Sequence, residues 1–273
     1  MNPYKPLDID QIEAARESSR IGKKIVLFQS TASTNDIAWE YAVNVDNDGL
    51  CVLTESQYKG RGRRGRVWFS ELRQSVLCSV LLTKTAAPAE MLTLTAGVAV
   101  AEAIIDYCKT SCRIKWPNDI LIQDQKIAGI LTEKQTVDGS DAFVIGIGIN
   151  CHQTAAVFAG YDLQIPATSL AIETGQDIDR TKLVCGLLEQ IELWLGKADH
   201  PSSIVNRQSG NNPVTQRWLQ LSGMLGRHIT VECDGIRHSG FCRGVDPVNG
   251  LILQLDNSLV RLFAAAQTHI IES

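Results

Sequence analysis

The order in which hydrophobic patterns follow one another limits the fold of this chain most strongly. Residues 89–108 carry apolar side chains at helical spacing and predict one long central helix. Short apolar runs predict strands at residues 24–28, 50–54, 75–82, 112–115, 120–122, 126–132 and 143–149. Further helices are predicted at residues 8–20, 37–45, 167–173, 183–195 and 213–221. Because strands and helices come in runs rather than in alternation, we expect an α+β fold with a mixed, largely antiparallel sheet and helices packed on it.

The pattern changes at about Gly223. From there on, five short strand patterns follow one another, separated by turn sequences such as Asp234-Gly235 and Asn249-Gly250. We therefore expect two domains, a larger one at residues 1–222 and a small all-β barrel at residues 223–273.

Charge and cysteine content exclude several classes of protein. The 273 residues carry a net charge of −4, which argues against broad binding of nucleic acid. None of the eight cysteines forms a C-x-x-C pair, so we expect buried free thiols in a reducing compartment. The first residues show no secretory signal and no long apolar run follows, so we expect a cytoplasmic protein that makes no contact with membranes.

One short segment concentrates positive charge and backbone freedom. Residues 60–66 read GRGRRGR, with four arginines among three glycines. Glycine lets a backbone approach a ligand closely, and arginine matches the oxygen atoms of carboxylates and phosphates. The segment predicts an anion-binding loop, and we expect it to be loose when empty and to fold over its ligand.

Four other segments carry polar or glycine-rich motifs. They read STASTN at residues 30–35, KWPND at 115–119, KIAGIL at 126–131 and GIGIN at 146–150. Composition and spacing alone indicate no more than an anion-binding α+β protein.

Together with GRGRRGRVW at residues 60–68, these motifs resemble those of biotin protein ligases, in their order and their spacing. The resemblance extends over about residues 24–273 and is closest to the form without an N-terminal DNA-binding domain. It implies a catalytic domain of the class II aminoacyl-tRNA-synthetase and biotin ligase type, followed by an SH3-like barrel.

The resemblance also implies a reaction in two steps. Biotin would attack the α-phosphorus of ATP to give biotinyl-5′-AMP, and a lysine of a biotin carboxyl carrier protein would then attack the acyl carbon and release AMP. ATP and Mg²⁺ would be required, with Mg²⁺ held largely by phosphate oxygens. Arg63 and Lys126 are the implied catalytic residues, because the first step brings two anions together.

The same resemblance assigns the remaining site residues. Those expected to bind biotin are Ser33, Thr34, Asn35, Gln57, Arg61, Gly62, Arg63, Lys126 and Gly129. Those expected to bind the nucleotide are Arg63, Arg64, Arg66, Trp68, Asn118, Lys126 and Asn150. Asp119 is expected to orient the acceptor lysine, and no metal site made of protein ligands alone is expected.

Taken one at a time, several of these residues have simpler explanations. They are a helix N-cap for Ser33, Thr34 and Asn35, a solvated surface charge for Lys126, core packing for Trp68, a turn cap for Asp119 and a strand-end cap for Asn150.

Two rival functions remain open at the level of the sequence. A lipoate or octanoate transferase would share the larger fold, but its linear apolar acid does not match the polar set at residues 33–35 and 57. An RNA-binding module could use the arginine and glycine loop. Since about 23 residues precede the first strand, we expect no DNA-binding module, and a sheet edge could pair two protomers into a homodimer.

Overall fold

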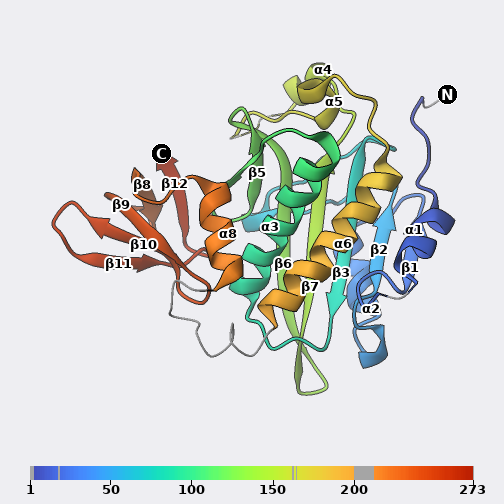
Figure 1. Ribbon diagram of the computed structural model, residues 1–273, viewed down its shortest axis with the longest axis horizontal. Coiled ribbons are helices and arrows are strands. Elements are labelled where there is room, and N and C mark those ends of the chain that lie inside the picture. The colour runs from blue at the N-terminus through green and yellow to red at the C-terminus, as the bar shows by residue number, and fades with distance from the viewer. Residues whose placement is uncertain (1–2, 18, 162, 164, 200–211, 273) are drawn as a thin grey trace.

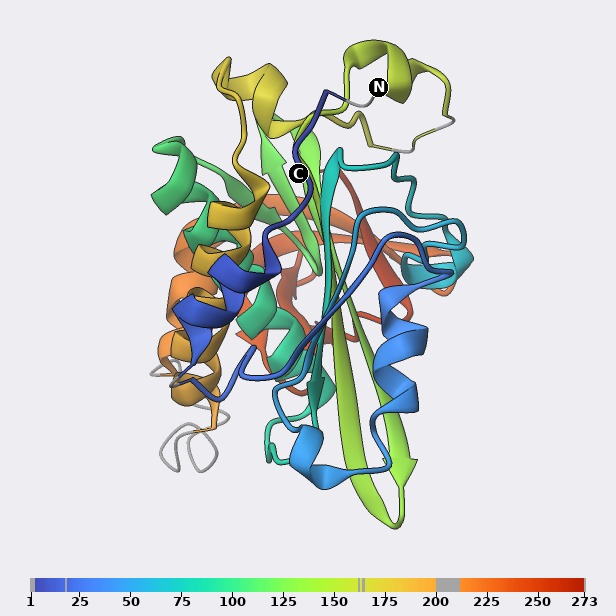
Figure 2. The ribbon, with the colours of Figure 1, turned by 90° about the vertical axis from the view of Figure 1, so that its right-hand side faces the viewer.

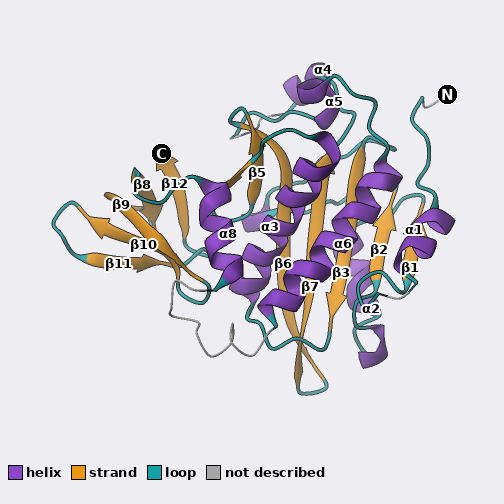
Figure 3. Cartoon of the chain, in the orientation of Figure 1, coloured by secondary structure: helices purple, strands orange, loops and turns teal. Residues whose placement is uncertain are grey.

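The chain folds around two β-sheets, one of seven strands and one of five (Figures 1 and 3). The computed structural model describes residues 3–17, 19–161, 163, 165–199 and 212–272. The large sheet has the order β1-β2-β3-β7-β6-β5-β4, and all its neighbours are antiparallel except the parallel pair β1 and β2. Its strands are β1 (Ile25–Phe28), β2 (Cys51–Thr54), β3 (Ser75–Leu82), β4 (Arg113–Lys115), β5 (Asp119–Ile122), β6 (Gln125–Val137) and β7 (Ser140–Asn150). The predicted α+β fold with a mixed, largely antiparallel sheet is confirmed.

Helices cover both faces of the large sheet (Figure 2). One face carries α1 (Ile9–Arg16), α3 (Ala89–Cys108), α6 (Arg180–Ala198) and α8 (Pro213–Ser222), and the opposite face carries α2 (Thr34–Glu40). Helix α3 matches the predicted range and is buried along most of its length. It is long and apolar enough to span a bilayer, but 72% of its apolar window is buried within this fold, as expected of a core helix.

The smaller sheet is antiparallel throughout, in the order β11-β10-β9-β8-β12. Its strands are β8 (His228–Cys233), β9 (Ile236–Asp246), β10 (Gly250–Leu255), β11 (Val260–Phe263) and β12 (Thr268–Glu272). Asp234 and Gly235, between β8 and β9, have φ values of 51° and 78°, as a two-residue hairpin turn requires. This sheet is called the barrel below.

Several element boundaries differ from those predicted. Helix α2 begins three residues before the predicted start at Ile37, because the extended backbone of Ser33 (φ −156°) already supplies the N-cap. The helix ends at Glu40, and Val45–Asn47 form a separate 3₁₀ turn. The short helices α4 (Ala155–Ala159) and α5 (Leu170–Thr174) follow β7, and the first of them was not predicted.

The eight cysteines are free thiols, as predicted. Six are buried, and Cys112 and Cys185 are half-buried. Burial raises the pKa of Cys151 to about 12, so this thiol stays protonated near neutral pH.

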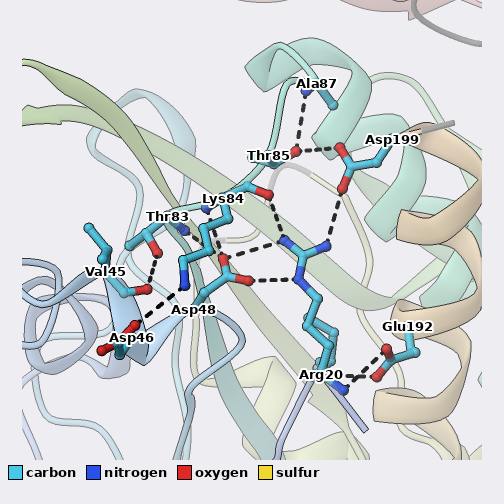
Figure 4. A network of polar contacts seen from close by, with 11 residues as sticks. Arg20, Val45, Asp46, Asp48, Thr83, Lys84, Thr85, Ala87, Glu192 and Asp199 are labelled. Carbon is cyan, nitrogen blue, oxygen red and sulfur yellow. Dashed lines mark hydrogen bonds and ion pairs between the residues drawn. The ribbon is translucent and has the colours of Figure 1, made fainter. Parts of the chain in front are cut away.

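A network centred on Arg20 joins the segment after α1 to other parts of the domain (Figure 4). Its Nε atom lies 2.7 Å from Oδ2 of Asp48, and its Nη1 atom lies 3.2 Å from Oδ2 of Asp199. Asp48 also accepts hydrogen bonds from the backbone N–H groups of Thr83 and Lys84, each 2.9 Å long. Four separate stretches of the chain therefore meet at one guanidinium and one carboxylate.

Candidate active site

A cavity of about 770 Å³ lies where α2, strands β6, β7 and β12, and the segment at residues 61–71 come together. Every site residue predicted from the sequence lines it. They are Ser33, Thr34, Asn35, Gln57, Arg61, Gly62, Arg63, Arg64, Arg66, Trp68, Asn118, Asp119, Lys126, Gly129 and Asn150. Segments as far apart in sequence as residues 33 and 150 thus form one wall of polar and charged groups.

The start of α2 supplies the first three of these residues. Ser33 holds the N-cap position, but its side chain makes no capping hydrogen bond, so helix capping does not account for its hydroxyl. The backbone N–H of Thr34 instead donates to Oε1 of Gln57 over 2.7 Å. Ser33, Thr34 and Asn35 are each less than 5% exposed, although they line the cavity.

Glycines in β6 and β7 make room for two large side chains. A Cβ atom on Gly146 would lie 2.3 Å from Oδ1 of Asn35, and one on Gly148 would lie 2.4 Å from Cε2 of Trp68. Gly129 is similar, since its Cβ would lie 3.0 Å from the same indole. The glycines of the GIGIN motif are therefore required by close packing at the cavity floor.

Residues 60–68, called the flap below, form a tight loop over this floor. The N–H of Gly62 donates to the carbonyl of Arg66 over 2.7 Å, and the N–H of Trp68 donates to the carbonyl of Gly60 over 2.9 Å. Arg64 adopts a positive φ of 56° within it. Gly65, the next residue, has a φ of 72°, which glycine adopts without steric cost.

The arginines of the flap point to different partners. Arg61 pairs with Asp36 at 2.7 Å and with Glu133 at 3.3 Å, so its charge is balanced by two carboxylates. Arg66 has no ion-pair partner among the described residues and lines the cavity.

Arg63 and Arg64 reach across to the barrel. Arg63 donates to the carbonyl of Ala265 over 2.5 Å, and Arg64 donates to the carbonyl of Ala266 over 3.2 Å. Arg63 also lies 3.3 Å from Oδ1 of Asn118. Burial and the neighbouring charge of Arg64 lower the pKa of Arg63, which nevertheless stays protonated at neutral pH. The flap is therefore held between the two sheets.

Lys126 forms the cationic centre of the opposite wall. Its ammonium lies 2.5 Å from Oδ1 of Asp119 and 5.6 Å from the ring centroid of Trp68. The side chain is only 23% exposed, so the alternative of a solvated surface charge is wrong. Asp119, at the start of β5, serves as the counterion of Lys126 rather than as a turn cap.

Two asparagines complete the polar lining. Asn118 donates to the carbonyl of Ile130 over 2.8 Å and presents its oxygen to Arg63. Asn150, at the end of β7, donates to the carbonyl of Thr168 over 3.0 Å, so its amide also caps the strand end. Both side chains are fixed before any ligand binds.

Residues 153–164, expected from their position alone to cover adenine, supply part of the lining. The cavity is also bordered by an apolar group after β7, and its members are Val157, Phe158, Tyr161, Leu163 and Ile165. Tyr161 stacks on Phe69 with ring centroids 3.8 Å apart, so this segment contacts the residue that follows the flap. The residues of β12 that line the cavity, Thr268 to Ile271, were not predicted. No local sequence pattern marks these residues as part of the site, because they lie far along the chain from the polar motifs.

Known proteins resemble this chain in sequence. Residues 27–150 match the biotin/lipoate A/B protein ligase family. The chain is 31% identical to the bifunctional ligase/repressor BirA of Bacillus subtilis over 95% of its own length and 78% of that protein. It is 30% identical to the biotin–[acetyl-CoA-carboxylase] ligase of Paracoccus denitrificans over 82% of its own length and 91% of that protein.

A solved structure supports the fold independently. The biotin protein ligase from Aquifex aeolicus, in complex with biotin and ATP, superimposes with a TM-score of 0.72 and 24% identity. The match covers 92% of this chain and 100% of that one. The identity to the two bacterial ligases, over most of their length and of this chain, shows that the chain belongs to the biotin protein ligase family.

Proposed function

We propose that this enzyme activates biotin with ATP as biotinyl-5′-AMP and transfers the biotinyl group to a lysine of a biotin carboxyl carrier protein. The observation that carries the proposal is the convergence of all fifteen predicted site residues on one cavity of about 770 Å³. A cavity of this size suits a small acid joined to a nucleotide.

The polar base of the cavity suits the ureido ring of biotin. A ureido group has one acceptor oxygen and two N–H donors, which hydroxyl and amide side chains can match. Ser33, Thr34 and Asn35 supply such groups at buried positions, and Gln57 supplies one at a half-buried position. A linear apolar acid would form no hydrogen bond with the donors and acceptors of these groups that the protein leaves free, at a cost of about 1–3 kcal/mol for each one that is buried. This disfavours lipoate or octanoate as the substrate.

The cationic wall suits the adenylation step. The carboxylate of biotin and the phosphates of ATP repel each other, and fixed cations in a dry site lower that barrier by several kcal/mol. Lys126 lies at the cavity wall beside Trp68, and Arg63 approaches from the flap. We assign these two side chains to the neutralisation of the reacting carboxylate and α-phosphate, with Arg64, Arg66, Asn118 and Asn150 as further nucleotide contacts.

In the second step an acceptor lysine must lose a proton before its amine can attack the acyl carbon. Asp119 is held by Lys126 in the empty site. Binding of the anionic adenylate would compete for Lys126 and leave the carboxylate of Asp119 to accept the hydrogen bond of the incoming amine. AMP then leaves with the electron pair of the broken acyl–phosphate bond.

Mg²⁺ would enter with ATP rather than occupy a site of protein ligands. Among the described residues no group of three or more His, Cys, Asp or Glu side chains could hold a metal. The acidic side chains that line the cavity are Glu71 and Asp119, and the latter is already paired. Phosphate oxygens would therefore supply most of the ligands, as is usual for Mg²⁺. Residues 1–222 are proposed to carry the catalysis and residues 223–273 to form a separate barrel domain.

The test is incubation with ATP, labelled biotin and a biotin carboxyl carrier domain. Label should appear on the acceptor lysine and should require ATP and a divalent cation. Labelled octanoate in place of biotin should give no product. Label from octanoate but not from biotin would move the assignment to the lipoate branch, and no label from either would refute the function.

A further inference from the structure

Two polar side chains outside the predicted site contact its biotin-binding residues. Ser79 on β3 is fully buried, with Oγ 2.7 Å from Oγ1 of Thr34 and 2.6 Å from Oδ1 of Asn35. Glu133 on β6 lies 3.0 Å, through its Oε2 atom, from Nδ2 of Asn35. Gln57 continues this series of contacts on the far side of Thr34. The series from Glu133 through Asn35, Ser79 and Thr34 to Gln57 is called the relay below.

Each hydrogen bond of the relay has a definite donor, because each group carries a limited number of protons. An ionised carboxylate can only accept, so Glu133 must face the NH₂ group of Asn35, and the amide oxygen must face Ser79. That oxygen carries no proton, so the hydroxyl of Ser79 must donate to it. Since a hydroxyl has a single proton, the 2.7 Å contact between Ser79 and Thr34 requires Thr34 to be the donor. The longer contact of the same hydroxyl, 3.2 Å from Oε1 of Gln57, then carries no proton.

The orientation of the groups at the cavity follows from this order. Thr34 turns its proton inward and presents lone pairs toward the cavity. Gln57 receives the N–H of Thr34 on its oxygen, which turns its NH₂ group away from the helix. No protein partner of that NH₂ group occurs among the described residues. The base of the cavity therefore offers an acceptor at Thr34 and donors at Gln57, which complement the N–H and C=O groups of a cyclic urea.

We propose that Glu133 and Ser79 are positioning residues that set this donor and acceptor pattern and thereby determine specificity for the ureido ring. The inference rests on the proposed function and deepens it. Neither residue needs to touch biotin. Glu133 is the fixed end of the relay, because its carboxylate also accepts from Nε1 of Trp39 at 3.1 Å and from Arg61 at 3.3 Å.

Substitutions in the relay should change the affinity for biotin without changing the chemistry. Ser79→Ala removes the inward acceptor of Thr34, so the hydroxyl can rotate and the Michaelis constant for biotin should rise about tenfold. Glu133→Gln should act in the same direction, because a neutral amide can face Asn35 with either end. Glu133→Asp keeps an acceptor at that position and should restore much of the affinity.

Kinetic constants distinguish a loss of positioning at the biotin site from a general loss of folding or activity. The Michaelis constant for ATP, and kcat at saturating biotin, should stay within about twofold of the wild type. The loss caused by Ser79→Ala should shrink for a biotin analogue that is methylated at the ureido nitrogens, since it lacks the N–H that Thr34 accepts.

Trp39→Phe is a matched control, because it removes one donor to Glu133 and leaves the relay intact. It should bind biotin as the wild type does. Unchanged biotin constants in Ser79→Ala and Glu133→Gln would overturn the relay, and so would equal losses for biotin and ATP. Failure of the wild-type enzyme to bind biotin at all would instead overturn the proposed function.

Discussion

The ammonium of Lys126 lies 2.5 Å from the carboxylate of Asp119, at the wall of the cavity that faces Trp68. In the empty enzyme each group neutralises the other. The pair therefore keeps a cation in a half-buried position until an anion arrives to compete for it.

Lys126→Gln should lower the rate of adenylation by about 100-fold, because one preorganised cation is lost from the transition state. The exchange of labelled pyrophosphate into ATP, which depends on biotin, measures this step alone. Asp119→Asn should instead slow the transfer from preformed adenylate to the carrier domain. A normal exchange rate in Lys126→Gln would contradict the role given to that residue.

Arg63→Gly should weaken retention of biotinyl-5′-AMP. The side chain ties the flap to Asn118 and to the carbonyl of Ala265, so its loss frees the loop over the cavity. Adenylate released into solution should increase about tenfold or more, as measured by its hydrolysis or by labelling of bystander amines. Lys59→Ala, at an exposed position just before the flap, is the control and should retain the intermediate. Equal retention in both variants would argue against a closing flap.

Gly148→Ala should impair activity more than stability. The added methyl group would lie 2.4 Å from the indole of Trp68, so the ring must leave the cavity floor. We expect kcat/KM for biotin and ATP to fall about tenfold or more, with a small change in Tm. Gly186→Ala, in α6 with open space around it, should keep full activity and unfold at the same or a higher temperature.

Asp48→Asn should lower the stability of the protein in a pH-dependent way. Burial raises the pKa of Asp48, but hydrogen bonds from Arg20 and the backbone N–H of Thr83 outweigh it, and the pKa lies below its ordinary value of 3.8. A lowered carboxyl pKa stabilises the fold above the unfolded value and loses that contribution as the pH falls through the folded value.

The free energy of unfolding should therefore drop by about 1–3 kcal/mol at pH 7 in Asp48→Asn. The difference from the wild type should shrink as the pH falls below 3.8, the ordinary carboxyl value. Urea unfolding at pH 7 and at pH 3 measures it. Asp46→Asn, whose side chain is largely exposed, should change stability little at either pH. A constant difference for Asp48→Asn at both pH values would refute the coupling.

The sequence predicted the fold well where periodic apolar patterns were long. Helix α3 has its predicted limits, because the apolar spacing over residues 89–108 has no competing interpretation. The limits of α2 were less accurate, since the extended backbone of Ser33 and the turn at Val45–Asn47 depend on packing against the sheet. The short helix α4 carries too few residues for a helical period to appear.

The site was predictable where residue type carries the chemistry. Lys126 taken alone suggested a surface charge, and the surrounding motif indicated its place in the cavity. Ser79 and Glu133 could not be found in this way, because they lie 44 and 98 residues from Asn35 and carry no motif of their own. A contact to a backbone carbonyl cannot be predicted from residue type, because every residue carries that oxygen.

The flap is attached to the barrel through main-chain oxygens. The oxygens that receive Arg63 and Arg64 belong to the main chain of Ala265 and Ala266. Every amino acid supplies the same oxygen there, so mutational drift of these side chains leaves the anchorage intact. An insertion or deletion that shifts this turn between β11 and β12 by one position would abolish it.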